Sequence, residues 1–207
     1  MIAPLAIVAA SYLVGSIPAG FVVGKLFFGV DVRRYGSGNI GATNVLRTFG
    51  IGTAAAVFAI DVAKGALPVA IVGWLSGEPW WQMAAALAAV VGHNWGVFLR
   101  FRGGRGVSTA MGGLLAMTPQ LALPPLAIGL AIIGVSRYAS LGSLIGAALA
   151  LTIIAVAVAL GSEPLAYLVY AAPAVALIFV QHRDNIERLL AGKERKLGGP
   201  AEPREPG

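Results

Sequence analysis

Long apolar runs, separated by short polar segments, make up most of the chain. The apolar runs lie at about 2–28, 51–75, 83–99, 107–117, 121–135, 141–160 and 165–180. A helix needs about 20 apolar residues to cross a hydrocarbon core of about 30 Å. Two proline-containing pairs, 118–119 and 124–125, interrupt the region 107–135, which predicts a short helix, a turn and a second helix. The pattern predicts seven transmembrane helices, or six if 107–135 is one broken unit.

The composition favours an all-α, polytopic integral membrane protein. Of the 207 residues, 57% are hydrophobic and 12% are charged, which is about half the charged share of a soluble domain. A disordered chain has the opposite balance. The chain has no cysteine, which excludes disulfide scaffolds, cysteine nucleophiles and cysteine zinc sites, and two histidines are too few for a histidine metal cage. We expect no metal, no cofactor and no nucleic-acid partner.

The basic residues, except Lys64 inside the second helix, fall on one side when seven spans are threaded alternately. They follow the first, third, fifth and seventh helices, whereas the connections 76–82, 118–120 and 161–164 contain no lysine or arginine. The positive-inside rule then places the N-terminus outside and the C-terminus in the cytoplasm. Trp74, Trp80 and Trp81 gather at the outer face, as an interfacial aromatic belt does. Residues 1–197 are expected to form one membrane domain and 198–207 a flexible tail.

The first of three polar segments on the cytoplasmic side is rich in glycine. It contains G-x-G-x-x-G at 36–41, but a membrane helix precedes it, which argues against a dinucleotide-binding fold. Glycines let backbone N–H groups approach an anion closely. The N-terminus of the helix that follows also favours an anion. We expect Thr43 or Asn44 to cap this helix and Arg47 to lie on its first turn. A tight loop joining two membrane helices is the alternative. The residues expected to bind an anion here are Ser37, Gly38, Asn39, Gly41, Thr43, Asn44 and Arg47.

The second polar segment follows the third predicted helix. It reads Gly103-Gly104-Arg105-Gly106 and lacks the Gly-Lys-Ser/Thr order of a Walker A loop. Its glycines still permit a backbone anion nest, and Arg105 can supply a bidentate guanidinium. His93, near the end of an apolar helix, is interpreted as a structural hydrogen-bonding residue, with a ligand role as the alternative.

The third polar segment places His182 and Asn185 three residues apart, on one face if the seventh helix continues. The spacing from His182 to Glu187 resembles an acyltransferase His/acid pair, but five residues on a helix do not converge, so we interpret it as coincidence. The basic residues from 183 to 196 are interpreted mostly as a solvated face. Inside the second helix, Asp61 and Lys64 are expected to form an ion pair; the alternative is that Lys64 borders an anion site.

These motifs resemble those of the PlsY family, the bacterial membrane acyl-phosphate:glycerol-3-phosphate acyltransferases. The resemblance lies in 37–44 with Arg47, in 103–107 after Gly92-His93, and in 182–186, and it extends to 12–18 and 61–65. It covers about residues 10 to 196. The family loop usually reads Gly-Gly-Lys-Gly, whereas this chain has Arg105, and Gly96 stands where the family often has proline.

The resemblance implies a seven-helix enzyme of the bacterial inner membrane whose motifs face the cytoplasm. Such enzymes transfer a fatty acyl group from acyl phosphate to the 1-hydroxyl of sn-glycerol 3-phosphate, giving lysophosphatidate in the first step of phospholipid synthesis. The resemblance implies that Ser37, Arg47 and Arg105 bind phosphate and that His182 and Asn185 hold the glycerol end.

An acyl phosphate is already activated, so direct attack by the hydroxyl is expected, and Ser37, His182 and Asn185 are the expected catalytic residues. The base is either His182 or the phosphate of glycerol 3-phosphate, with the phosphate favoured. Expected partners are acyl phosphate, glycerol 3-phosphate, membrane lipids and the enzyme that produces acyl phosphate. The alternatives are a transporter of a phosphorylated metabolite and an acyl-CoA-dependent enzyme.

Overall fold

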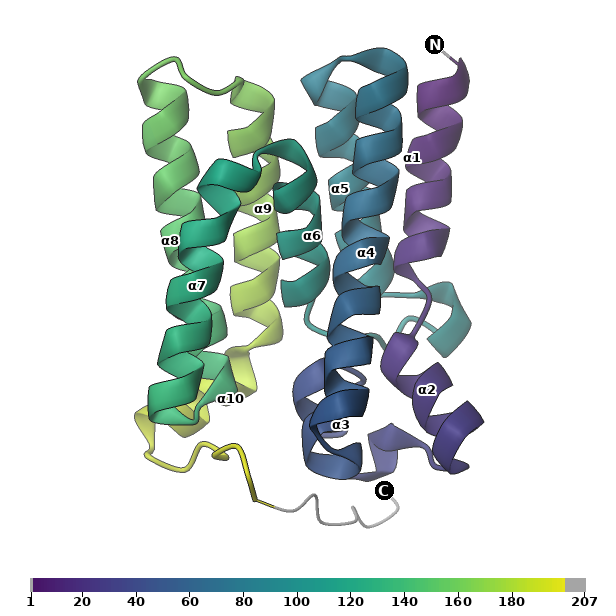
Figure 1. Ribbon diagram of the computed structural model, residues 1–207, viewed down its shortest axis with the longest axis vertical. Helices are drawn as coiled ribbons and strands as arrows, with labels where there is room; N and C mark the ends of the chain where they lie inside the picture. Colours follow the sequence, from purple (N-terminus) through teal and green to yellow (C-terminus); the bar gives the residue numbers. More distant parts are fainter. Residues whose placement is uncertain (1, 200–207) are drawn as a thin grey trace.

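The computed structural model describes residues 2–199, which form a bundle of helices (Figure 1). Of the expected tail at 198–207, only 198 and 199 belong to the described residues. Two short 3-10 turns, η1 (Val32–Arg34) and η2 (Val97–Leu99), lie in the connections. The helices are α1 (Ile2–Gly15), α2 (Ala19–Phe28), α3 (Ala42–Phe49), α4 (Ile51–Ser76), α5 (Pro79–Asn94), α6 (Val107–Met117), α7 (Pro119–Ser136), α8 (Ala139–Ala159), α9 (Leu165–Gln181) and α10 (Arg183–Leu190).

The helices follow the apolar runs of the sequence. By length and composition, four stretches can cross a membrane alone: α4, Pro79–Leu99 (α5 with η2), α7 and α8. Two bent pairs qualify together, α1 with α2 at 46° and α9 with α10 at 60°, and α6 is a shorter apolar helix. Thr118 and Pro119 separate α6 from α7, as expected, and Pro124 and Pro125 lie inside α7 without ending it.

The first apolar run, expected as one helix over 2–28, is broken in two. Helix α1 ends at Gly15 and α2 begins at Ala19, because Pro18 has no backbone N–H to continue the ladder. The hydropathy of the run does not reveal this break, since apolar residues continue on both sides. The carbonyl of Ile17, inside the break, accepts a hydrogen bond from Lys64 Nζ of α4 at 2.8 Å.

Small residues bring the helix backbones close together. A Cβ at Gly15 of α1 would collide with the carbonyl of Ala89 in α5, and a Cβ at Gly65 of α4 would collide with the carbonyl of Thr109 in α6. Close packing of this kind is how helices associate in lipid, where burial of apolar surface gives little driving force. Large apolar side chains such as Trp74 remain exposed on the outside of the bundle, as a lipid-facing surface requires.

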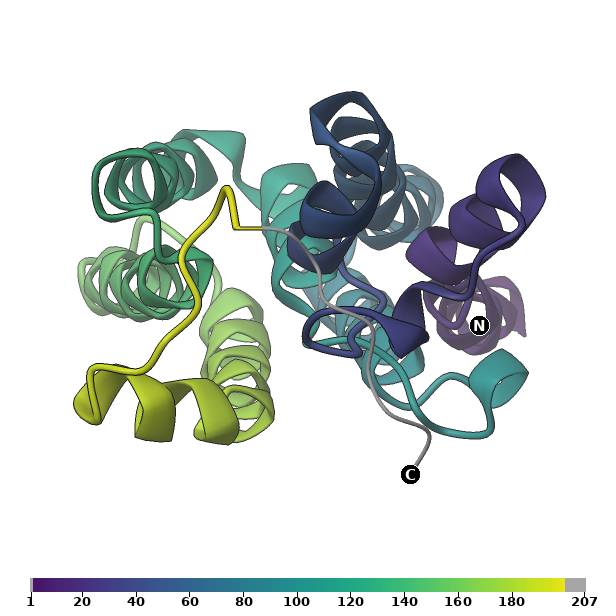
Figure 2. The same ribbon diagram turned by 90° about the horizontal axis from the view of Figure 1, so that it is seen from below.

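The polar connections collect at one end of the bundle. In Figure 1 this is the lower end, where α2, α3 and α10 lie, whereas the α4–α5 and α8–α9 turns lie at the upper end. Seen from below in Figure 2, the segment after α10 crosses beneath the bundle, from the group α7, α8 and α9 toward α3. The fold therefore brings the three polar segments of the sequence to one end.

Candidate active site

The glycine loop before α3 is folded around the side chain of Asn44. Its Nδ2 lies 3.0 Å from the carbonyl oxygens of Val32 and Tyr35 and 2.9 Å from that of Asn39. Its Oδ1 accepts a hydrogen bond from the backbone N–H of Ser37 at 2.9 Å. The amide of Asn44 is thus used within the protein, and its contribution is to fix the shape of the loop.

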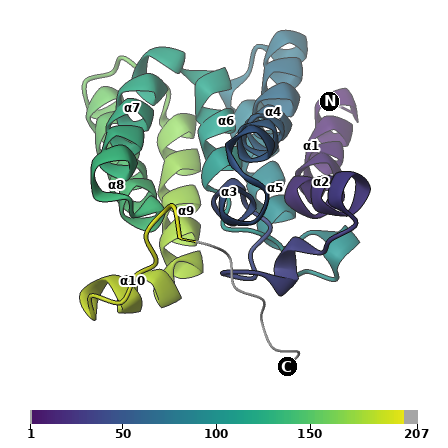
Figure 3. The ribbon, with the colours of Figure 1, turned by 60° about the horizontal axis from the view of Figure 1, so that its bottom comes forward.

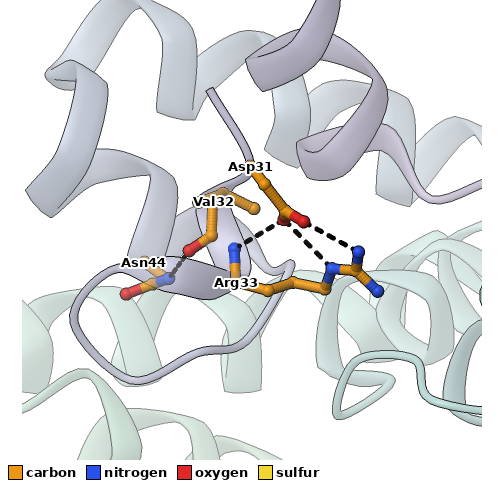
Figure 4. A network of polar contacts seen from close by, with 4 residues as sticks. All are labelled: Asp31, Val32, Arg33 and Asn44. Carbon is orange, nitrogen blue, oxygen red and sulfur yellow. Dashed lines mark hydrogen bonds and ion pairs between the residues drawn. The ribbon is translucent and has the colours of Figure 1, made fainter. Parts of the chain in front are cut away.

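The start of this loop is fixed by an ion pair. Asp31 Oδ1 accepts from the backbone N–H of Arg33 at 3.0 Å, and Asp31 Oδ2 lies 2.8 Å from Arg33 Nη2. Figure 4 shows these contacts beside the bond from Asn44 to Val32. The hydrogen bonds from Arg33 lower the pKa of Asp31. The loop therefore leaves η1 in a defined direction.

Helix α3 differs from the expectation in two respects. Its N-cap is Gly41, with no side-chain cap, so Thr43 and Asn44 lie inside the helix instead of capping it. Arg47 accordingly lies in the last turn and not the first. Its Nη2 donates to the carbonyl of Arg195 at 3.0 Å, and its Nε is buried with no partner in the part of the chain that the structure describes. A half-buried guanidinium whose buried Nε–H is unpaired is suited to bind an anion.

The second loop uses its glycine N–H groups internally. Gly103 donates to the carbonyl of Asn94 at 3.1 Å, and Gly104 donates to the carbonyl of His93 at 2.9 Å. These two N–H groups therefore do not form the expected anion nest. Gly106 has φ +79° and turns the chain into α6, with Arg105 immediately before it. The loop's contribution to a ligand site is thus the guanidinium of Arg105. Burial lowers the pKa of Arg105, and Arg188 lowers it further.

The third segment does not continue the seventh helix straight. The chain bends by 60° between α9 and α10, and His182 lies at the bend. His182 Nδ1 is 2.8 Å from the carbonyl of Ile178; because a carbonyl only accepts, Nδ1 carries the proton in the neutral ring and Nε2 is the acceptor. Burial, with Arg105 nearby, lowers the pKa of His182 to about 4.

Asn185, one turn further, also presents an acceptor. Its Nδ2 donates to Glu194 Oε1 at 2.7 Å, whereas its Oδ1 is buried and has no partner among the described residues. His182 Nε2 and Asn185 Oδ1 are therefore two hydrogen-bond acceptors on neighbouring turns. Groups of this kind require a ligand that donates, such as a hydroxyl.

All three polar segments meet at one pocket of about 50 Å³. Of the residues named from the sequence, Gly38, Gly41, Gly103 and Gly104 are not in its lining, Gly106 and His93 line a second cavity instead, and Lys64 lines neither of the two. The residues named from the sequence that do line the pocket are Ser37, Asn39, Thr43, Asn44, Arg47, Arg105, His182 and Asn185.

The sequence analysis missed several residues of this pocket, above all Glu194. Its Oε1 accepts from Ser140 Oγ at 3.0 Å and its Oε2 from Arg188 Nε at 2.9 Å, in addition to the bond from Asn185. Glu194 belongs to a segment that we call the C-terminal strap, residues 193–197, which lies between α10 and α3 in Figure 3. No spacing rule links Glu194 to Ser140, 54 residues earlier. Three further lining residues were missed, Ala139, Ser140 and Ser143, and Arg188 and Arg195, interpreted as part of a solvated face, line the pocket instead.

A second, larger cavity of about 360 Å³ adjoins the polar pocket. Its walls are apolar side chains of α4, α6, α7, α8 and α9, among them Phe58, Met111 and Ile178. Both cavities share part of their lining, so they lie directly against each other. The shared residues are Thr43, Arg105, Ala139, Ser143 and His182.

Charge distinguishes the polar pocket from this apolar cavity. The polar pocket's lining includes four arginines, at 47, 105, 188 and 195, and one carboxylate, Glu194. The site therefore combines an apolar cavity with a cationic end. Such a site fits an amphiphile with an anionic head group.

A family model described as glycerol-3-phosphate acyltransferase matches residues 5–192. The chain belongs to this family. A glycerol-3-phosphate acyltransferase 2 of Moorella thermoacetica is 48% identical, over 94% of this chain and 97% of that protein. A glycerol-3-phosphate acyltransferase of Thermus thermophilus is 47% identical, over 94% of this chain and 95% of that protein.

Two solved structures of the family are also similar. The crystal structure of PlsY (YgiH), an integral membrane glycerol 3-phosphate acyltransferase, in its glycerol 3-phosphate form has a TM-score of 0.89 and 41% identity, and 95% of this chain and 96% of that one are covered. The lysophosphatidic acid form gives 0.86 and 40%, with the same coverage. The resemblance seen in the sequence is confirmed. With its apolar helices, the chain is a multi-pass membrane protein of this acyltransferase family.

Proposed function

We propose that the protein transfers a fatty acyl group from acyl phosphate to the 1-hydroxyl of sn-glycerol 3-phosphate, releasing lysophosphatidate and phosphate. The observation that carries this proposal is the junction of the two cavities, where Arg105 and His182 line both. An acyl chain in the apolar cavity brings its carbonyl to this junction. Two solved relatives, described as glycerol 3-phosphate and lysophosphatidic acid forms, support the identity of acceptor and product.

The arginines of the polar pocket support phosphate-bearing substrates. Two phosphates placed together repel, so the site that holds them must supply several cations. Arg47 and Arg105 supply two of these, and Ser37 adds a hydroxyl at the first loop. The arginine-lined polar pocket suits phosphate groups, which supports acyl phosphate as the donor.

The two acceptors, one at the α9–α10 bend and one in the first turn of α10, support a glycerol site. His182 Nε2 can accept a hydrogen bond from the hydroxyl that attacks, and Asn185 Oδ1 can accept from the neighbouring hydroxyl. Glu194 occupies the amide N–H of Asn185 and so leaves its oxygen for the ligand. We assign to His182 and Asn185 the positioning of glycerol for attack.

The reaction then needs one nucleophilic attack and one proton transfer. The glycerol oxygen bonds to the acyl carbon, the C–O bond to phosphate breaks, and phosphate leaves with the bonding electron pair. Arg105 is placed to stabilise the charge that develops at the carbonyl and the leaving group. The hydroxyl proton passes to a phosphate, whose second pKa near 6 makes it a stronger base than a buried histidine with a pKa of about 4.

We further propose seven spans, with the N-terminus outside and the pocket at the cytoplasmic face of a bacterial plasma membrane. The support is the distribution of charge: the end that holds the pocket carries the arginines, whereas Glu78 and Glu163 lie in the connections at the opposite end. In this arrangement α1 with α2 counts as one crossing and α6 as a short one, and α9 crosses before the 60° bend, which leaves α10 at the cytoplasmic face. Residues 1–197 are then a single membrane domain.

A phosphate-release assay tests the function. Purified protein in detergent is given palmitoyl phosphate, with and without glycerol 3-phosphate, and both inorganic phosphate and lysophosphatidate are measured. We expect equimolar release that requires glycerol 3-phosphate, and no product when palmitoyl-CoA replaces the donor. Formation of lysophosphatidate from palmitoyl-CoA would show that the protein is an acyl-CoA-dependent enzyme. Uptake of glycerol 3-phosphate into proteoliposomes without phosphate release would instead assign a transporter.

A further inference from the structure

A buried polar cluster lies behind the second loop, outside the substrate pocket. Asp61 Oδ1 is 2.8 Å from Lys64 Nζ on the same helix, α4, and 3.7 Å from His93 Nδ1 on α5. All three residues are at most 5% exposed. The mechanism above uses none of them.

Stability alone does not account for this cluster. Charges inside a membrane protein are costly to desolvate, and a well-packed apolar pair of the same size is often as stable or more so. The cluster is also incompletely satisfied, because His93 Nδ1 is buried, lies 3.7 Å from Asp61 Oδ1 and has no hydrogen-bond partner among the described residues. Buried polar groups of this kind mark functional positions more often than packing positions.

The second loop hydrogen-bonds to the backbone of His93 and packs against its side chain. The carbonyl of His93 accepts from the N–H of Gly104 at 2.9 Å, and the carbonyl of Asn94 accepts from the N–H of Gly103 at 3.1 Å. A Cβ at position 104 would collide with His93 Nε2, so the imidazole lies directly against the loop backbone. A rotation of this ring toward the loop would therefore displace Gly104, which directly precedes Arg105.

Asp61 and Lys64 define where this ring lies. The carboxylate of Asp61 faces His93 Nδ1, and Lys64 neutralises that carboxylate while donating to the carbonyl of Ile17 in the α1–α2 break. A line of contacts thus extends from α1 through α4 and α5 to the loop. Asp61, His93 and Arg105 all border the apolar cavity, so the line ends where the reaction is proposed to occur.

We propose that Asp61 and Lys64 are positioning residues, which act through His93 to hold the second loop and Arg105 in the geometry that binds phosphate. This rests on the proposed function only in that Arg105 contacts a phosphate. The proposal differs from a purely structural ion pair because the carboxylate must face His93, and neutralising both charges must weaken phosphate binding even in a well-folded protein.

Two double variants separate positioning from stability. Asp61→Asn with Lys64→Met removes both charges, so neither is left unpaired. Asp61→Lys with Lys64→Asp keeps the ion pair but turns the cation toward His93. The matched control is Gln82→Leu with Tyr167→Phe, which removes an interhelical hydrogen bond of 2.9 Å between α5 and α9 at the opposite end of the bundle.

The measurements are thermal unfolding, kcat, and the KM for each phosphate-bearing substrate. We expect both charge variants to fold and to raise at least one KM by about tenfold or more, while the control changes each constant by less than about twofold. If either charge variant folds and has wild-type kinetic constants, or if both variants fail to fold, the role of Asp61 and Lys64 is structural. Either outcome would overturn the proposal. An inactive wild type would instead reject the proposed function, so the two failures are distinguishable.

Discussion

The protonation of His182 determines which group can act as base. Because burial holds its pKa near 4, the ring is already neutral between pH 6 and 8 and gains no proton there. A change of rate with pH near neutrality, the neutral limb of the pH–rate profile, would then reflect titration of the substrate phosphate. We expect His182→Ala to lower kcat/KM by about tenfold or more and to leave the position of that limb unchanged. Steady-state kinetics from pH 5.5 to 8.5 test this, and a limb that vanishes with the side chain would make His182 the base.

Arg105 borders both cavities, in the position where the family usually has lysine. A guanidinium binds phosphate through two parallel N–H groups, whereas an ammonium acts as a point charge. We expect Arg105→Lys to keep turnover within about tenfold of wild type, since the charge remains, and Arg105→Met to lose about a hundredfold or more. Phosphate release under saturating substrate is the measurement. An inactive lysine variant would show that the planar group is required.

Among the elements, the first loop depends on the amide of Asn44. Asn44→Asp replaces an N–H donor by an oxygen that faces three carbonyl oxygens. Each buried polar group left unsatisfied costs about 1–3 kcal/mol, so we expect a lower melting temperature and a higher KM for glycerol 3-phosphate. Thr48→Ala is the control, because Thr48 Oγ1 bonds only to the carbonyl of Asn44 within the helix. Equal behaviour of the two variants would contradict a loop-shaping role.

The C-terminal strap is held over the pocket by the hydrogen bonds of Glu194 and, at its end, by exposed contacts of Leu197. Arg137 Nε and Nη2 donate to the carbonyl of Leu197 at 3.0 and 2.6 Å, and the N–H of Leu197 donates back to the carbonyl of Arg137 at 2.7 Å. Trypsin cuts after the exposed Lys193, Arg195 and Lys196 only when the backbone of the segment detaches from the bundle and can enter the protease. We expect trypsin to cleave between 193 and 197 several times faster in Arg137→Ala, but not in the control Arg102→Ala. Mass analysis of the fragments gives the rates, and unchanged cleavage would show that Arg137 does not hold the strap.

At the scale of the whole molecule, the sequence predicted the apolar helices well, but it predicted only part of the set of residues that enclose the polar pocket. A run of about 20 apolar residues has few alternatives in lipid, so α4, α8 and α9 lie where the pattern placed them. The break at Pro18 was missed because hydropathy is insensitive to a lost hydrogen bond. Glu194 was missed because its contacts to Asn185 and Ser140 join segments whose proximity depends on the bend after α9. The spacing of residues along the sequence thus identified the loops of the pocket, whereas the position of the Glu194 carboxylate between them depends on the tertiary structure.

The orientation of the whole molecule in the membrane can be tested with the chain's own composition. Because the protein has no cysteine, single cysteines are unique labels. We expect Glu78→Cys and Ser162→Cys to react with a membrane-impermeant maleimide in intact cells, and Arg183→Cys to react only after the membrane is permeabilised. Arg183 adjoins the pocket and its side chain is 77% exposed, so lack of labelling there reports the membrane barrier and not burial. Labelling of Arg183→Cys in intact cells would place the pocket outside, away from cytoplasmic glycerol 3-phosphate, and the proposed reaction could not occur there.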